Sequence, residues 1–425
     1  MEYIVVLIIL FKGLKYDKVS WSKSSLMWWK FEWLVLVLLA GLRYRVGGDT
    51  LSYMDNYSRM PTLSEIEFSI DYFVTGFYMP LWYYLVGLCK IVTEDFCFFQ
   101  IIHAIITNGV IFWFFKKYST RPFFAVLLYS CFFYLNYNTE TLRQTLTMCC
   151  FLLAVPSLYD GRYLKYYLLI ILGLGFHHSA FFLFLVPPIF ILFKRMDSNK
   201  MFLILFVVII GIVGVTQISS ISNLINGSDV LLGLDLVEKA TGNHEEMDAT
   251  LIGVISLLII RFLIPFCFLL CYKFNNNNEK AMFVMYVVLL GVSTPIIILY
   301  RILELFYIPF IAIMVNAYNQ LLCKKQSNDF SIVVSNPNHN NSTNILSRRK
   351  VKNLQLQRMF VVLLLINILF IRFSYYMTDQ SVLNSGKKAY RYERFIPYYS
   401  VFNPQMDSKR EVMRDNENAY AGMGN

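Results

Sequence analysis

Arginine, amide and histidine side chains stand beside the ends of several apolar runs. The stretch "AGLRYRVGGDTLSYMDNY" leaves an apolar run with Arg43, Arg45 and Asp49 within seven positions. Later, Arg143 and Gln144 open an apolar run after "NTET". The planar fork of arginine binds phosphate oxygens through paired hydrogen bonds. These residue types at helix ends predict a site for an anionic, phosphate-bearing ligand.

Three more residues extend this set. His177 and His178 form a pair at a predicted tight turn between two short apolar runs, and Arg301 precedes a later run. Arg261 differs from them because it lies inside the apolar run "ISLLIIRFLIPF". A charge at that depth costs several kcal/mol unless it faces a wet cavity or a partner. We therefore expect Arg261 to face a cavity.

Structural roles explain the same residues and remain open as alternatives. Arg43 and Arg45 can extend their charges to the interface without binding anything. Arg143 follows Glu140 at helical spacing, so a local ion pair explains it equally well; the same holds for Arg301 and Glu304. Asp49 can cap a helix that begins near Thr50. The histidine pair can bond backbone carbonyls at the interface.

The composition identifies the class of protein. The 425 residues are 57% apolar and only 16% charged, which excludes an ordinary soluble domain. The net charge of +10 lies mostly in short loops between apolar runs and therefore indicates topology rather than nucleic-acid binding. The sequence predicts an all-α, polytopic integral membrane protein.

The apolar runs predict about twelve transmembrane helices, within a range of roughly 11 to 14. The predicted spans cover residues 2–14, 27–43, 97–115, 122–137, 141–159, 163–176, 178–193, 201–217, 250–272, 280–300, 302–322 and 358–376. The run Pro80 to Val92 makes a helix of about 20 Å, which is short of a bilayer core of about 30 Å. We interpret it as a re-entrant or surface-lying helix.

Charge asymmetry predicts the orientation. With the N-terminus outside, most lysines and arginines fall in internal loops, among them Lys116, Lys117 and Arg121. The candidate site residues then lie outside. The bundle comprises residues 1–322 with outer loops 43–96 and 218–249. Residues 323–357 are predicted as a flexible cytoplasmic linker, 358–376 as the last transmembrane helix, and 377–425 as an outer tail with a disordered polar end.

Several stretches resemble one known family. "LRYRVGGDTLSY", "ETLRQTLTMCCFLLA" and "KYYLLIILGLGFHHSAFFLFLVP" resemble successive motifs of the EpsG-like polysaccharide polymerases, relatives of the Wzy polymerases. "YRILELFYIPFI" resembles a later arginine-led helix of that family, and "RFIPYYSVF" its C-terminal stretch. The N-terminal span is shorter than is usual there, and the Asn-rich segment before the last span resembles an insertion.

The resemblance implies a fold and an activity. It implies a C-type glycosyltransferase fold with outer loop helices, in the cytoplasmic membrane of a bacterium. Such an enzyme joins polyprenyl-diphosphate-linked oligosaccharide units at the outer face, into a capsule, exopolysaccharide or O-antigen. It implies a lipid-linked donor and acceptor, with a chain-length regulator and a flippase as possible partners. The residues that match its motif positions are Arg43, Arg45, Asp49, Arg143, Gln144, His177, His178 and Arg301.

Roles follow as hypotheses from the chemistry of that reaction. Asp49 or His178 would act as general base, and Arg143 would stabilise charge on the leaving diphosphate. Diphosphate or sugar binding is assigned to Arg43, Arg45, Tyr53, Gln144, His177, Arg261 and Arg301. The outer loops contain no Asp-x-Asp motif, so we expect no metal and no cofactor.

Two other functions share some of these features. A flippase or transporter of lipid-linked glycans also needs a basic cavity, but it should show inverted repeats, and no repeat is evident. A glycan ligase would use the same chemistry to move finished glycan to another acceptor. The products of the reaction would separate the three.

Overall fold

The computed structural model describes residues 1–18, 21–66, 79–196, 264–272, 274, 276–293, 297–334, 355–366, 369, 376–377, 379–381 and 388–412. These residues belong to two compact units. The first unit contains Met1–Phe184 together with Ile368–Asn425, and the second contains Leu185–Asn367. Each unit is described by itself below.

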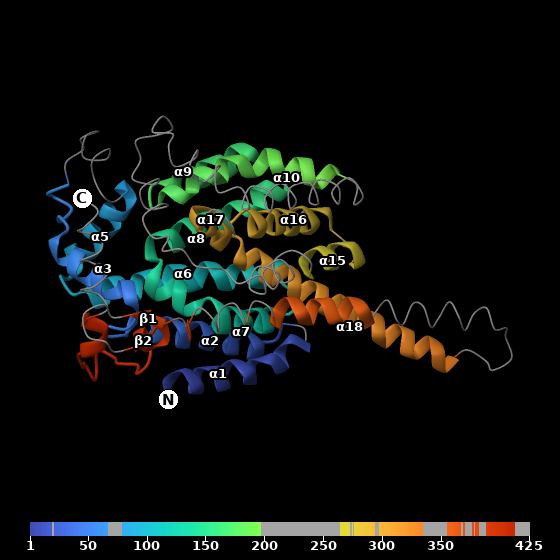
Figure 1. Cartoon of the computed structure of the whole chain (residues 1–425), viewed down its shortest axis with the longest axis horizontal. Coiled ribbons are helices and arrows are strands. Elements are labelled where there is room, and N and C mark those ends of the chain that lie inside the picture. Colours follow the sequence, from blue (N-terminus) through green and yellow to red (C-terminus); the bar gives the residue numbers. More distant parts are fainter. Residues whose placement is uncertain are drawn as a thin grey trace. The chain divides into compact units, whose positions relative to one another are not determined.

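The first unit is built from helices, with one short pair of strands (Figure 1). Its helices are α1 (Glu2–Gly13), α2 (Lys23–Gly41), α3 (Gly48–Arg59), α5 (Pro80–Val92), α6 (Phe96–Tyr118), α7 (Pro122–Phe132), α8 (Leu142–Tyr159) and α9 (Tyr163–Leu174). A 3₁₀ segment, Leu14–Lys18, follows α1, and a π-helical turn, Asn136–Glu140, precedes α8. Strands β1 (Asp379–Ser381) and β2 (Lys388–Tyr390) pair antiparallel.

The described part of the second unit is helical. It contains α10 (Val186–Arg195), α15 (Ile264–Cys271), α16 (Asn277–Val292), α17 (Ile297–Leu305), α18 (Tyr307–Val334) and an apolar helix, Gln355–Ile366. Helices α10 and α16 pack together, and Asn316 of α18 donates to Glu279 of α16 at 2.8 Å. The 3₁₀ segment His178–Leu185 leads from α9 into α10.

Four helical stretches of the described chain are long and apolar enough to cross a bilayer. They are α2, α6, α8 and the continuous stretch His178–Arg195. Shorter apolar helices include α5, α7, α9 and Gln355–Ile366. The predicted all-α membrane class is confirmed, apart from the three-residue strands. The number of about twelve spans and the C-type glycosyltransferase fold stay predictions.

The helices of the first unit have two chemically different ends. At one end, which we call the basic end, Asp17 accepts hydrogen bonds from the backbone N–H groups of Phe123 and Phe124. There the exposed Lys116 lies over the Trp21 ring at 4.7 Å, and the Tyr118 and Tyr159 rings meet at 5.6 Å. The basic end thus joins residues 14–18 and 21 to residues 116–124 and 159.

The opposite end, which we call the signature end, comprises residues 42–60, 93–97, 134–144, 175–178 and 394–401. The Tyr398 hydroxyl donates to the Leu39 carbonyl at 2.9 Å, and Thr50 donates to the Thr139 carbonyl at 3.0 Å. Figure 1 shows α3, α5 and the two strands grouped at this end of α2 and α6. The candidate residues of the first unit all belong to it.

Helix α5 begins and ends at the signature end. The Leu81 N–H donates to the Gly175 carbonyl at 2.8 Å, and the Thr93 carbonyl after the helix accepts from Tyr57 at 3.4 Å. Trp82 and Val86 are buried against neighbouring helices. The arrangement agrees with a helix that does not continue to the basic end.

Two predicted spans differ from the observed helices. The predicted span 122–137 ends at Phe132, and the buried π-helical turn replaces its last residues. The predicted span 302–322 is two helices that break at Phe306, where Pro309 falls in the first turn of α18 and costs least. As a result, Arg301 lies exposed within α17 rather than at a turn.

The predicted linker and tail are also more ordered than expected. Helix α18 continues to Val334, so residues 323–334 of the predicted linker are helical, because their lysines and glutamine are good helix formers. Residues 388–412 of the tail form defined contacts, including those of its polar part. The predicted outer loop 218–249, the predicted span 201–217 and Arg261 lie outside the described residues.

Asp17 gives the basic end a pH-dependent stability. Burial is the main reason that the pKa of Asp17 rises from 3.8 to about 6, against the opposing effect of the Phe123 and Phe124 hydrogen bonds. The folded protein then holds a proton that the unfolded chain has released, so stability from this group falls as pH rises from about 4 to about 6. In thermal unfolding in detergent, we expect Asp17→Asn to lose this dependence. Equal pH profiles for the variant and wild type would contradict the assignment.

Candidate functional site

The connection from α2 into the first turn of α3, residues 42–49, is held by the C-terminal part of the chain. We call these residues the signature loop and residues 388–412 the C-terminal segment. The Val401 N–H donates to the Leu42 carbonyl at 2.9 Å, and the Tyr44 N–H donates to the Tyr399 carbonyl at 2.9 Å. The loop therefore takes its shape from a segment far along the sequence.

Two consecutive glycines allow the signature loop to approach its neighbours. Gly47 has φ of +105°, and a Cβ there would lie 2.6 Å from Thr139 Cβ. A Cβ on Gly48 would overlap the Arg394 side chain, at 2.7 Å from its Cζ. Glycine is needed at the first position for both backbone conformation and space, and at the second for space.

Arg43 is an interior residue rather than an interfacial one. Its exposed fraction is 2%, and its guanidinium donates to the Ala40 carbonyl. Its own carbonyl accepts from Gln100 Nε2 at 3.1 Å. Its Nε and Nη2 have no hydrogen-bond partner among the described residues. The alternative in which Arg43 extends its charge to the interface does not hold, because the side chain is buried.

Arg45 forms the paired contact that is expected of an anion-binding arginine. Its partner is a carboxylate of the same chain. Its Nε and Nη2 donate to the two oxygens of Glu411 at 2.7 and 2.6 Å. Its backbone φ is +53°, in the left-handed region. Glu411 comes from the polar part of the C-terminal segment, which the sequence analysis treated as disordered.

Asp49 and Tyr53 lie on the first turns of α3. The helix begins at Gly48, so Asp49 is within the first turn and does not precede the helix as a cap. It is half-buried where the helix dipole favours a negative charge. The Tyr53 ring packs on Trp82 at a centroid distance of 5.6 Å.

Arg143 and Gln144 occupy the first turn of α8, Gln144 buried and Arg143 half-buried. Hydrogen bonds among Asn108, Tyr129 and Asn138 fix the π-helical turn before them. Asn108 Nδ2 donates to Asn138 Oδ1 at 2.9 Å, and Asn138 Nδ2 donates to the Tyr129 hydroxyl at 2.9 Å. His103 of α6 contacts the Leu142 carbonyl at 3.0 Å. These buried polar groups set the position at which α8 starts.

The histidine pair lies at the end of α9. Nδ1 of His177 accepts from the Ser179 N–H at 3.1 Å and contacts the Ser179 hydroxyl at 2.9 Å. A neutral His177 therefore carries its proton on Nε2. His178 is exposed, and its ring lies 5.4 Å from that of His177.

One apolar cluster joins these motifs. Its buried members come from α3, α5, α6 and α8, and Tyr53 and Phe176 pack against it. Phe176 directly precedes the histidine pair, and cluster residues Leu142 and Leu146 flank Arg143 and Gln144 on α8. The cluster thus brings three sequence motifs to the signature end. Arg301 belongs to the second unit.

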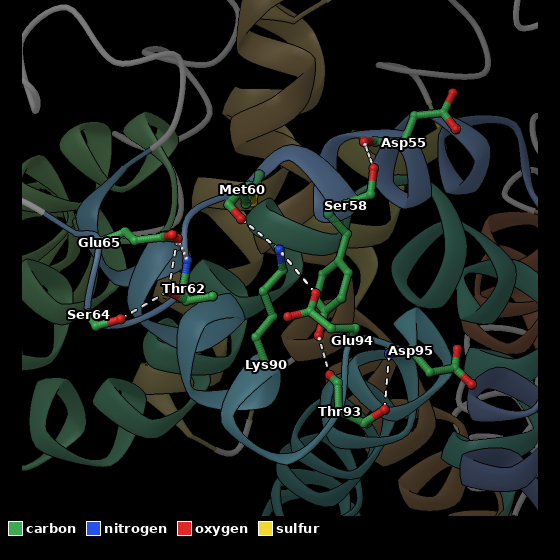
Figure 2. A network of polar contacts seen from close by, with 11 residues as sticks. Asp55, Ser58, Met60, Thr62, Ser64, Glu65, Lys90, Thr93, Glu94 and Asp95 are labelled. Carbon is green, nitrogen blue, oxygen red and sulfur yellow. Dashed lines mark hydrogen bonds and ion pairs between the residues drawn. The ribbon is translucent and has the colours of Figure 1, made fainter.

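Lys90 was not identified from the sequence. Its side chain is 3% exposed, and Nζ donates to the Met60 carbonyl at 2.6 Å and lies 3.5 Å from Glu94. Figure 2 shows Lys90 reaching from α5 between Met60 and Glu94. It also lies 5.3 Å from the Tyr57 ring centroid. The sequence feature that could have identified Lys90 is its position inside the apolar run "PLWYYLVGLCKIV".

The C-terminal segment supplies two further arginines that were missed. Arg394 forms a buried ion pair with Glu140 at 3.6 Å, and its carbonyl accepts from the Gly47 N–H at 2.8 Å. Arg410 donates to the carbonyls of Glu393 and Arg45 at 3.0 and 3.2 Å. Both arginines are buried.

Comparison with known proteins now adds the family. The EpsG family model matches residues 27–335. The chain belongs to the EpsG family. No curated protein and no solved structure matches it. The EpsG match contains the signature loop, the start of α8 and the histidine pair, but it ends before the C-terminal segment. Membership of the EpsG family and the apolar helices identify a multi-pass membrane protein of the polysaccharide-polymerase type.

Alanine at Gly47 or Gly48 should destabilise the signature end. We expect a loss of about 1–3 kcal/mol for Gly47→Ala because of its positive φ and the contact with Thr139, and a comparable loss for Gly48→Ala against Arg394. Gly109→Ala is the matched control, since its Cβ would meet only Trp33 Nε1 at 3.8 Å. Thermal unfolding in detergent measures all three. A control as unstable as the other two would show that the loop is not special.

Proposed function

We propose that this EpsG family member is a membrane glycosyltransferase that polymerises polyprenyl-diphosphate-linked oligosaccharide units. The paired contact of Arg45 with both oxygens of Glu411 carries the proposal, because it is an arginine fork already oriented on an anion. A diphosphate offers the same pair of oxygens and would replace Glu411 there. The start of α8 and the histidine pair at the same end support the proposal further.

The reaction transfers a growing glycan between lipid carriers. A hydroxyl of the acceptor unit attacks the anomeric carbon of the donor, and the sugar–phosphate bond breaks. The electron pair of that bond leaves with the lipid diphosphate, which gains negative charge. Arg45 and Arg143 would stabilise this charge more strongly in the transition state than in the ground state.

The proton of the acceptor hydroxyl passes to a general base. Asp49 is a candidate because it is half-buried in the first turn of α3. His178 is the second candidate because it is exposed, whereas Nδ1 of His177 is occupied by Ser179. Both candidates are kept. Tyr53 and Gln144 would contact the sugar, and diphosphate binding by Arg261 and by Arg301 stays a prediction from the sequence alone.

The proposal includes an orientation and partners. The basic end carries exposed lysines, including Lys12, Lys15, Lys116 and Lys117, and it would face the cytoplasm of a bacterium. The signature end would then lie at the outer face of the cytoplasmic membrane. There it would meet the lipid-linked donor and acceptor, beside a flippase and a chain-length regulator.

Arg143→Ala should abolish chain extension while the protein still inserts. Loss of one charge-stabilising donor costs at least about 100-fold in rate. Purified protein receives lipid-linked repeat units in the presence of a metal chelator, and the products are separated on a gel. Wild type should produce a ladder; a single-addition product would indicate a ligase, and no new glycosidic bond a transporter.

Arg162→Ala is the matched control for that experiment. Arg162 is an exposed arginine whose partner is Asp160 beyond the end of α8, and its removal should leave the ladder unchanged. Arg143→Lys retains the charge but loses the fork, so we expect a strong reduction. Full activity of Arg143→Lys would argue against a bidentate phosphate contact.

Cysteine labelling should place the two ends on opposite sides of the membrane. In a background without reactive native cysteines, His178→Cys should react with an impermeant maleimide added outside intact cells. Lys117→Cys, an exposed position at the basic end, should react only after the cells are opened. Labelling of both positions from the same side would refute the proposed topology.

A further inference from the structure

The residue that connects the parts of the proposed site lies outside the EpsG match. Arg394 follows β2 in the C-terminal segment, and its side chain is 7% exposed. Its carbonyl accepts from Gly47, and its side chain covers Gly48, so it touches the signature loop through backbone and side chain. Asp49 is the next residue of that loop.

The other end of the Arg394 side chain reaches the start of α8. Its Nη1 lies 3.6 Å from Glu140 Oε1, and the Glu140 side chain is only 6% exposed. Glu140 is the last residue of the π-helical turn, and Arg143 follows in the first turn of α8. The Arg394 side chain therefore contacts both the loop that contains Asp49 and the π-helical turn that precedes Arg143.

Arg410 holds the backbone that carries Arg394. Its Nε donates to the Glu393 carbonyl, its Nη1 to the Arg45 carbonyl, and its Nη2 to the Pro397 carbonyl. The Arg410 side chain thus connects Glu393, the residue before Arg394, with Arg45, whose guanidinium binds Glu411. Arg410 therefore links the C-terminal segment to the signature loop by hydrogen bonds.

We propose that Arg394 is a positioning residue of this enzyme, fixing the spacing between the Asp49 loop and the Arg143 helix start through Gly48 and Glu140. This inference rests on the proposed glycosyl transfer for its effect on rate. A lysine would keep the charge, but it lacks the flat, branched head that covers Gly48 while it reaches Glu140. The C-terminal segment is then part of the active site, although it lies beyond the family match.

The test separates positioning from stability. Arg394→Lys and Glu140→Gln are compared with Lys409→Gln, which removes an exposed contact of the same segment with Glu393. Folded protein is first isolated by size exclusion, and kcat and KM for chain extension are then measured on that fraction only. Positioning predicts that folded Arg394→Lys loses about 10- to 100-fold in kcat, with little change in KM. The control should match wild type.

Hydrogen exchange on the same samples gives a readout that does not need activity. Peptides covering residues 43–52 and 136–146 should both lose protection in Arg394→Lys, and neither should change in Lys409→Gln. If wild type makes no polymer, the proposed function fails, while this exchange result still decides the coupling. The inference is overturned if folded Arg394→Lys has wild-type kcat, or if the two peptides keep their protection.

Discussion

The signature end depends on how closely three chain segments meet at Gly47 and Gly48. A Cβ at either position would overlap Thr139 or Arg394, so the loop, the π-helical turn and the C-terminal segment assemble as one unit. The Arg394–Glu140 pair adds an electrostatic condition, because each charge is buried and would be costly without the other. Close packing and charge pairing together fix the backbone on which Asp49, Arg143 and Arg45 stand.

The sequence predicted the helices where composition alone decides them. Apolar runs bounded by charged residues, glycine or proline gave α1, α2, α5, α6 and α8 to within a few residues. The π-helical turn was missed because it depends on partners elsewhere. Asn138 is buried only because Asn108 and Tyr129 satisfy its amide, and an unpaired amide there would be unfavourable. Such reciprocal hydrogen bonding across helices has no local pattern in the sequence.

The sequence names candidate site residues but not their contacts. The arginines and glycines of the sequence indicated the signature loop. However, Glu411, the partner of Arg45, is 366 positions away. Glu411 and Arg410 lie in a stretch whose polar composition is typical of disorder, whereas Arg394 begins the aromatic stretch "RFIPYYSVF". The polar composition is misleading here because the charged side chains of this segment bind backbone carbonyls and opposite charges of the signature loop. Local composition cannot reveal a charge that is needed by a distant segment.

Positive charge serves two different purposes at the two ends of the first unit. At the basic end, the lysines are exposed, so water and salt weaken their fields and leave mainly a topological signal. At the signature end, Arg43, Arg45 and Arg394 are held by backbone carbonyls and carboxylates in surroundings that screen charge poorly. Arg43 contributes a buried guanidinium with two nitrogens that lack partners among the described residues. This difference in burial, rather than the net charge, is the physical reason for proposing diphosphate recognition at the signature end.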